Sequence, residues 1–340
     1  MPWYAVEDLD DALDATKSLL TPFDARQWLK LALVVFFLGN ASSGSSWTAG
    51  SSTDAPPDAP PGPAGPTGVE VDLPFAFGEV LPVVLGIVAV ALVVGLVYSL
   101  VGSVMEFVFV ESLRRQRVRI RPYADQHFGQ ALRLFAFRVA LGLLVVVPVL
   151  GILASVVSFA GGQPGFSVGL LAVFVPLLIF LGIAVAVVDG FTTNFVVPVM
   201  ILKNVGILDG WRRFWPALTG QWEQYGVYVL VRFGLALAVG LLASVVGGIV
   251  GALLAAPLAV VGVLAVPAFG GPAALLSNPV AVAVAVALLL GYLALLTAAL
   301  SLVFVPVQTY LRYHALLVLG DTESDFDLIP ELRRDVRETG

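Results

Sequence analysis

Charged side chains inside long apolar runs are the residues of this sequence best placed to do chemistry. Glu106 and Asp189 lie near the ends of two such runs, and Arg138 and Arg232 lie near the starts of two others. Hydrocarbon does not solvate a charge, so a charge in a bilayer needs a partner or a purpose. Two interpretations are open: ion pairs between helices, Glu106 with Arg138 and Asp189 with Arg232, or a relay for protons or ions. We favour the pairs.

The stretch "DGFTTNFVVPVM" at 189–200 concentrates polar residues at the end of one apolar run. Thr193 and Asn194 are able to hydrogen-bond across helices or to contact a substrate. About 20 residues span a bilayer, and a helix that starts near 167 reaches that length near 188. We therefore interpret this stretch as the place where a helix leaves the inner leaflet, rather than as a reaction centre.

A second group of basic residues lies outside the apolar runs and forms candidate contacts with anionic lipid headgroups. Each such charge near a membrane surface contributes about 1 kcal/mol. The group consists of Arg114, Arg115, Arg117, Arg119, Arg121, Arg212 and Arg213. The alternative is that these residues only fix the topology of the chain.

Recognisable catalytic and metal-binding motifs are missing from the sequence. It has no cysteine and two histidines, His127 and His314, which are far apart in the chain. We find no intramembrane protease signature, no Walker loop and no HExxH motif. The sequence therefore predicts a protein that is not an enzyme and has neither a metal site nor a cofactor.

Composition places the chain in an all-α, multi-pass membrane class. Of its 340 residues, 59% are hydrophobic and only 12% are charged, which is far too apolar for a soluble domain. The 18 Lys and Arg residues fall in islands, and 31–113, 139–202 and 233–311 contain none. Each gap has room for a helix out and a helix back, and the positive-inside rule makes the islands cytoplasmic. We predict a polytopic bundle in the cytoplasmic membrane, with both termini cytoplasmic.

The predicted membrane domain, 28–318, has six transmembrane helices in three hairpins, with a weak parallel repeat between the hairpins. The spans are placed near 28–48, 79–111, 133–158, 167–201, 225–250 and 281–318. The first has a short apolar core that small residues extend. The Pro-interrupted stretch 251–279 is expected to be re-entrant or to lie on the outer surface.

The remaining segments are polar. An acidic amphipathic segment, 1–27, precedes the membrane domain, and an acidic tail, 319–340, follows it. The Pro/Gly/Ser-rich loop 49–78 is predicted to be disordered outside the membrane. Asn40 begins a glycosylation sequon, but it lies so close to the membrane that we expect it to be unmodified. Acidic soluble parts and few lysines are typical of a salt-loving archaeon.

Two stretches carry a resemblance to known families. The stretches 112–138 and 195–234 resemble an uncharacterised family of haloarchaeal six-span membrane proteins, a domain of unknown function. A looser resemblance is to the membrane domain fused to some glycerophosphodiester phosphodiesterases. It is carried by Phe195, Pro198, Gly206, Gly210, Trp211, Arg212, Arg213 and Trp215. No catalytic phosphodiesterase domain accompanies it, so the resemblance implies a fold and a membrane location.

The sequence favours a non-enzymatic accessory or scaffold protein that acts through its cytoplasmic surface. Membrane lipids are the expected partners, a protein partner is possible, and nothing suggests nucleic acid. The alternative is a small-solute or ion transporter, which needs polar residues from several helices around a cavity near the bilayer midplane.

Overall fold

The structure is a computed structural model that describes residues 3–41, 77–160, 163–268, 270–271 and 278–339. Its regular elements in the described residues are helical, which confirms the all-α class. Five of them are long: α3 (Phe77–Arg114), α4 (Ile120–Ala160), α5 (Pro164–Phe191), α8 (Trp222–Ala268) and α10 (Pro279–Thr322). The shorter ones are α1 (Tyr4–Leu20), α2 (Ala25–Ala41), π-helix η2 (Thr192–Val196), α6 (Val197–Lys203), α7 (Ile207–Gly220), η3 (Ser324–Phe326) and α11 (Pro330–Thr339).

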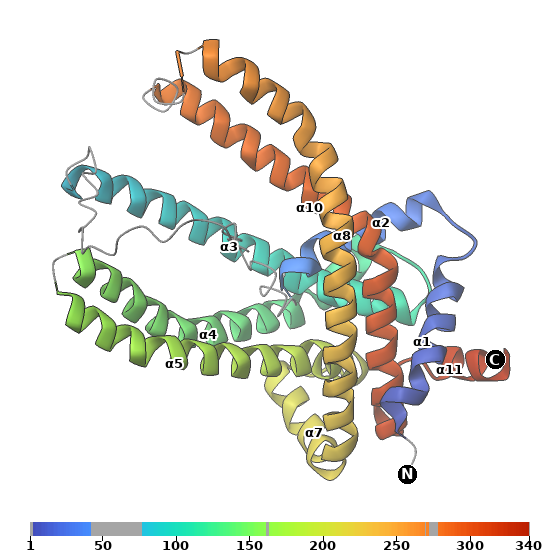
Figure 1. The fold of residues 1–340 in the computed structure, drawn as a ribbon. Helices are drawn as coiled ribbons and strands as arrows, with labels where there is room; N and C mark the ends of the chain where they lie inside the picture. The colour runs from blue at the N-terminus through green and yellow to red at the C-terminus, as the bar shows by residue number, and fades with distance from the viewer. Residues whose placement is uncertain (1–2, 42–76, 161–162, 269, 272–277, 340) are drawn as a thin grey trace, which may run out of the picture.

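Two helical arms diverge from one compact base (Figure 1). The first arm is built from α3, α4 and α5, with α4 packed against both of its neighbours. The second arm is the antiparallel pair α8 and α10. The base contains α1, α7, α11 and the ends of the long helices, and the chain begins and ends there.

Five helical segments in the described residues are long and apolar enough to cross a membrane. They are Leu92–Arg114, Ile120–Val156, Gly165–Lys203, Trp222–Ala268 and Val280–Thr322, with mean hydropathies of 2.1 to 3.0. The chain is therefore a multi-pass membrane protein by length and composition. The predicted span 28–48 is not among the five: α2 is described for only 17 residues, as far as Ala41. Most of the predicted loop 49–78, and Ser42 of the sequon, lie outside the described residues.

The helix that holds the predicted span 225–250 does not end near 250: α8 continues as one helix through Gly251 to Ala268. The expected re-entrant segment 251–279 is thus helical over its first 18 residues. Pro257 and Pro267 do not break this helix. A proline removes one backbone donor, and membrane helices tolerate that loss where local adjustments satisfy the freed carbonyl.

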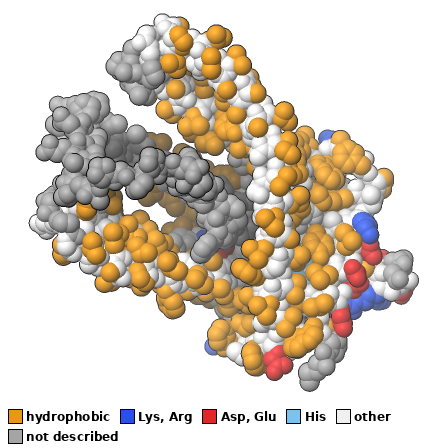
Figure 2. Space-filling view, in the orientation of Figure 1, with side chains coloured by type: hydrophobic (Ala, Val, Ile, Leu, Met, Phe, Trp, Pro, Cys, Tyr) orange, Lys and Arg blue, Asp and Glu red, His pale blue; other side chains and the backbone are white. Residues whose placement is uncertain are grey.

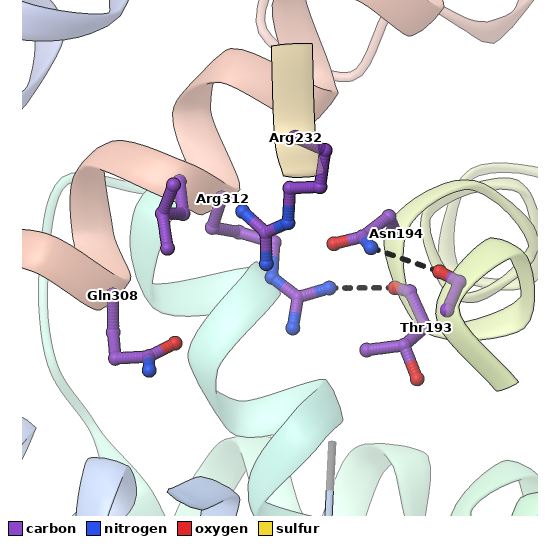
Figure 3. A pocket seen from close by; sticks show the side chains of 7 residues that line it. Thr193, Asn194, Arg232, Gln308 and Arg312 are labelled. Carbon is purple, nitrogen blue, oxygen red and sulfur yellow. Dashed lines mark hydrogen bonds between the residues drawn. The ribbon is translucent and has the colours of Figure 1, made fainter. Parts of the chain in front are cut away.

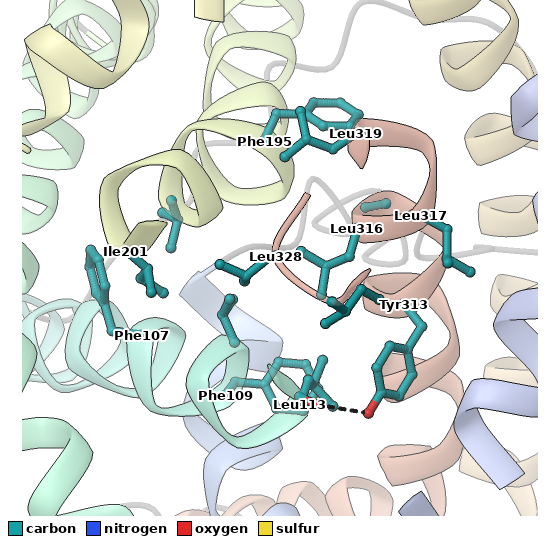
Figure 4. Packing of buried hydrophobic residues seen from close by; sticks show 14 of the residues in the cluster. Phe107, Phe109, Leu113, Phe195, Ile201, Tyr313, Leu316, Leu317, Leu319 and Leu328 are labelled. Atoms are coloured by element: carbon teal, nitrogen blue, oxygen red, sulfur yellow. Dashed lines mark hydrogen bonds between the residues drawn. The ribbon is translucent and has the colours of Figure 1, made fainter. Parts of the chain in front are cut away.

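A tightly packed hydrophobic core fills the base (Figure 4). Phe107 and Phe109 of α3, Phe195 of η2 and Leu316 of α10 each expose 1% or less of their surface. The Phe195 ring stacks on Phe214 of α7, with centroids 5.4 Å apart. The core therefore joins elements from the first arm, the second arm and α7.

The arms, in contrast, expose large apolar side chains along their length (Figure 2). Val147 of α4, Phe180 of α5 and Leu241 of α8 are 60%, 71% and 71% exposed. A helix that is hydrophobic on all sides is suited to a lipid environment. The surface of the arms is therefore the face expected to contact the bilayer.

Candidate functional site at the junction of base and arms

Polar side chains from both arms converge where the arms meet the base. Glu106 comes from α3, Arg138 from α4, Asp189 from α5 and Arg312 from α10. The π-helix η2 follows α5 directly and places Thr193 and its backbone carbonyl among them. Extra-wide turns of this kind occur often at functional sites, and here the turn redirects polar groups into the junction.

Arg312 links the two arms. Its Nη2 donates to Oε1 of Glu106, and its Nη1 donates to the carbonyl oxygen of Thr193 at 2.6 Å. Glu106 is fully buried and Arg312 is 6% exposed. Because both charges are removed from solvent, the loss of either would leave the other without compensation.

Arg138 holds the first arm together. Its Nε donates to Oδ1 of Asp189 at 2.9 Å, and its Nη2 donates to Oγ1 of Thr193 at 2.9 Å. Its Nη2 also lies 4.0 Å from Oε2 of Glu106. The side chain of Arg138 is 8% exposed, so this cation joins α3, α4, α5 and η2 within a largely dry junction.

The ion partners differ from those predicted. Glu106 and Arg138, the expected pair, are 4.0 Å apart between Oε2 and Nη2. Arg312 is the closer partner of Glu106. The expected pair of Asp189 with Arg232 is absent from the described contacts, because Asp189 binds Arg138 instead. The reason is the arrangement of the helices: α4 packs directly on α5, whereas Arg232 belongs to α8 in the other arm.

A polar recess opens beside this network (Figure 3). It is lined by Gly190, Thr193, Asn194, Arg232, Gln308, Leu311 and Arg312. The volume inside is about 20 Å³, enough for one or two water-sized groups. Asn194 donates to the carbonyl oxygen of Gly190 at 2.8 Å, so this hydrogen bond stays within its own helical segment. The Nη1 atom of Arg232 is buried and makes no hydrogen bond among the described residues.

The candidate lipid-binding arginines lie on the surface of the base. All seven, Arg114, Arg115, Arg117, Arg119, Arg121, Arg212 and Arg213, are exposed. Arg114, the last residue of α3, and Arg115, which follows it, contact the buried carboxylate of Glu111 in α3. That contact gives these two a structural role, while a role in lipid binding stays a prediction for the whole set.

A second charged cluster joins the two ends of the chain. Arg337 of α11 contacts Asp8 at 3.1 Å, Asp11 at 2.9 Å and Asp321 at 2.5 Å. Burial raises the pKa of Asp8 from 3.8 to about 8, with a further increase from the neighbouring Asp321, although Arg337 opposes it. The carboxyl group of Asp8 therefore titrates close to neutral pH.

The two histidines have structural contacts. A ring nitrogen of His127, Nδ1, lies 2.7 Å from Oε1 of Gln130, and Nε2 of His314 lies 2.8 Å from the carbonyl oxygen of Ala5. His314 also stacks on Tyr228 at 5.6 Å. Within the described ranges, no group of three His, Cys, Asp or Glu residues is arranged to hold a metal ion.

Sequence reasoning missed Arg312 as a member of the site. Arg312 directly follows the gap 233–311, so we counted it among the basic islands that set the topology. One signal was available: Arg312 lies inside the last apolar run, with Tyr310 and Tyr313 around it, as Arg138 lies inside another.

Comparisons with known proteins identify a family and nothing finer. The model of a family of unknown function (DUF7544) matches residues 3–329. No curated protein matches, and no solved structure matches. The family match bears neither on the source organism nor on the resemblance to the phosphodiesterase membrane domain.

Proposed function

We propose that this chain, which belongs to the family of unknown function DUF7544, is a non-enzymatic accessory or scaffold protein of the cell membrane. In this proposal the two arms lie in the bilayer, and the base carries the interactions with partners. Besides the five candidate spans, we keep the predicted span 28–48 as a sixth crossing. The helix α2 covers this span as far as Ala41.

The observation that supports this proposal is the position of the charges. Residues 139–160, 164–188, 233–268 and 279–311 contain no Asp, Glu, Lys or Arg. The shortest of these segments, 22 residues of α4, is about 33 Å long, and the hydrocarbon core is about 30 Å thick. The arms are thus long enough to span the bilayer beyond the charged junction. A transport site needs polar groups near the midplane of the bilayer. Here the ion pairs lie at the base end of the arms, outside the uncharged segments.

The charge distribution also supports a cytoplasmic base. All 18 Lys and Arg residues lie outside the uncharged arm segments, and both described chain ends lie in the base. The positive-inside rule then orients the base and the termini toward the cytoplasm. The acid-rich ends and the scarcity of lysine support an origin in a salt-loving archaeon.

Photo-crosslinking in native membranes tests the scaffold role. A photoreactive residue replaces Leu208 of α7 or Arg334 of α11, both exposed on the base, and Leu241 of α8 serves as the arm control. We expect stoichiometric protein adducts from the two base positions and lipid adducts from the arm position.

The transport alternative predicts a different outcome. If base positions give no protein adduct, and the purified chain makes liposomes permeable to ions in a way that Asp189→Asn abolishes, the scaffold proposal is wrong. Arg334→Gln is the matched control for that flux assay, because Arg334 is exposed and its described hydrogen bond is to the backbone of its own helix.

A further inference from the structure

We infer that the junction binds an anionic amphiphile, with a phosphate or carboxylate group at Arg232 and Arg312 and an apolar chain in the adjoining groove. The inference concerns the polar recess between the arms, and not the exposed arginines discussed above. It rests on the proposed function in one respect: the arms must lie in the bilayer, so that a lipid can reach the recess from the side.

The junction carries more positive than negative side chains. The junction holds three guanidinium groups, Arg138, Arg232 and Arg312. The carboxylates paired there are two, Glu106 and Asp189, and both are engaged by Arg138 and Arg312. Arg232 makes no ion pair among the described residues, and its Nη1 is buried without a hydrogen bond. An uncompensated cation in such a position is unfavourable, so the site is one negative charge short.

The recess also holds hydrogen-bond donors in an arrangement suited to an anion. The guanidinium groups of Arg232 and Arg312 lie next to each other, with Asn194 facing them (Figure 3). Arg312 uses its two Nη atoms on Thr193 and Glu106, but an arginine has five N–H groups, so donors remain. Two neighbouring guanidinium groups are the arrangement that proteins use to bind carboxylate and phosphate oxygens.

A groove lined in part by the apolar side chains of Val35, Phe36, Leu300 and Phe304 shares a wall with the recess. Its volume is about 160 Å³, and its lining comes from α2 and α10: Val35, Phe36, Thr297, Leu300, Ser301, Phe304 and Gln308. Gln308 lines both the groove and the recess. A ligand with a polar group and an apolar chain therefore has adjacent places for both parts.

The direction of the groove matches the orientation of a membrane lipid. Gln308, Phe304, Leu300 and Thr297 occupy successive turns on one side of α10, running from the base toward the arm tip. The 11 steps from Thr297 to Gln308 cover about 16 Å along the helix. A headgroup at Arg232 and Arg312 thus lies at the base end, and its chain points into the membrane.

The test measures ligand binding to the purified full-length protein in a neutral maltoside detergent. The probes are dodecyl phosphate, inorganic phosphate and dodecanol, and the readouts are native mass spectrometry and the ligand-induced rise in melting temperature. We expect saturable binding of one dodecyl phosphate and no such binding of the other two. Arg232→Gln should weaken that binding about 10- to 100-fold, because a charge-assisted hydrogen bond is lost.

Matched variants separate the two parts of the site. Thr297→Phe fills the groove and should weaken dodecyl phosphate binding, while Arg334→Gln, at an exposed site on α11, should leave it unchanged. Arg232→Lys keeps a positive charge and should retain part of the affinity. Without ligand, Arg232→Gln should melt at the same temperature as the native chain or higher, since Arg232 has no described partner to lose.

Three outcomes would overturn the inference. Binding that Arg232→Gln leaves intact excludes the recess, and an Arg232→Gln protein that melts lower without ligand shows that Arg232 is a structural residue. Inorganic phosphate that binds as tightly as dodecyl phosphate assigns the recess to a free anion and excludes the groove. This assay contains no partner protein, so its failure is distinguishable from a failure of the crosslinking experiment.

Discussion

The base and the arms of this molecule share the long helices but differ in which side chains those helices expose. In α8, Tyr225 and Tyr228 are 1% and 3% exposed in the base, whereas Leu241 and Leu253 are 71% and 70% exposed in the arm. The base buries its apolar groups in a protein core, and the arms present theirs outward. The two parts of this helix thus have different surroundings, and Arg232 lies between them.

The base and the arms should differ in how strongly a mutation changes the stability of the protein. Removal of a buried partner in the base leaves a cavity or a charge that nothing replaces. An outward-facing side chain of an arm has few protein contacts to lose. We therefore expect mutations of similar size to have very different effects in the two regions.

The largest effect is expected for Arg312→Gln. It leaves the fully buried Glu106 without its closest partner, and loss of one member of a buried pair costs about 3–5 kcal/mol. The measurement is thermal unfolding of the purified protein in detergent. The double variant Glu106→Gln/Arg312→Gln should recover part of the loss, and a double variant less stable than Arg312→Gln alone would contradict the pairing.

A smaller but cleaner contrast comes from two leucines. Leu316 of α10 is fully buried in the base, and Leu241 of α8 is 71% exposed on the second arm. Leu316→Ala should cost about 2–5 kcal/mol, because it opens a cavity. Leu241→Ala should change the stability by no more than about 0.5 kcal/mol. Equal losses in the same unfolding assay would break the distinction between base and arms.

The third effect depends on pH and arises at a single group. The folded protein holds a proton on Asp8 up to about pH 8, while the unfolded chain releases it near 3.8. Stability from this group is therefore greatest below the unfolded value and falls as pH rises from about 4 to 8. Asp8→Asn should remove that part of the slope. Melting temperatures of the two proteins at pH 5 and pH 8 check this, and an unchanged slope would contradict it.

The sequence predicted the long helices well, because apolar runs without charges leave few alternatives. The runs 79–111, 167–201 and 281–318 correspond to α3, to α5 with its continuation, and to α10. The boundaries were less accurate. The span expected at 133–158 begins as α4 at Ile120, because the polar residues before 133 continue the same helix inside the base.

The pairing of charges was not predictable from the sequence. Periodicity shows which residues share a helix face, but not which helices are neighbours. Asp189 binds Arg138 because α4 packs on α5, and Arg312 reaches Glu106 because α10 meets α3 in the base. The π-helix at Thr192–Val196 was also unforeseen. The predicted repeat among the hairpins stays a prediction.

Our central proposal is that the arms lie in the bilayer and that the base lies on its cytoplasmic side. The chain has no native cysteine, so single cysteines are clean reporters for a membrane-impermeant maleimide. We predict that Glu331→Cys in α11 reacts only in inverted vesicles, Gln163→Cys at the arm tip only in intact cells, and Leu241→Cys in neither. Labelling of Leu241→Cys, or labelling of the base and the arm tip from the same side, would contradict the account.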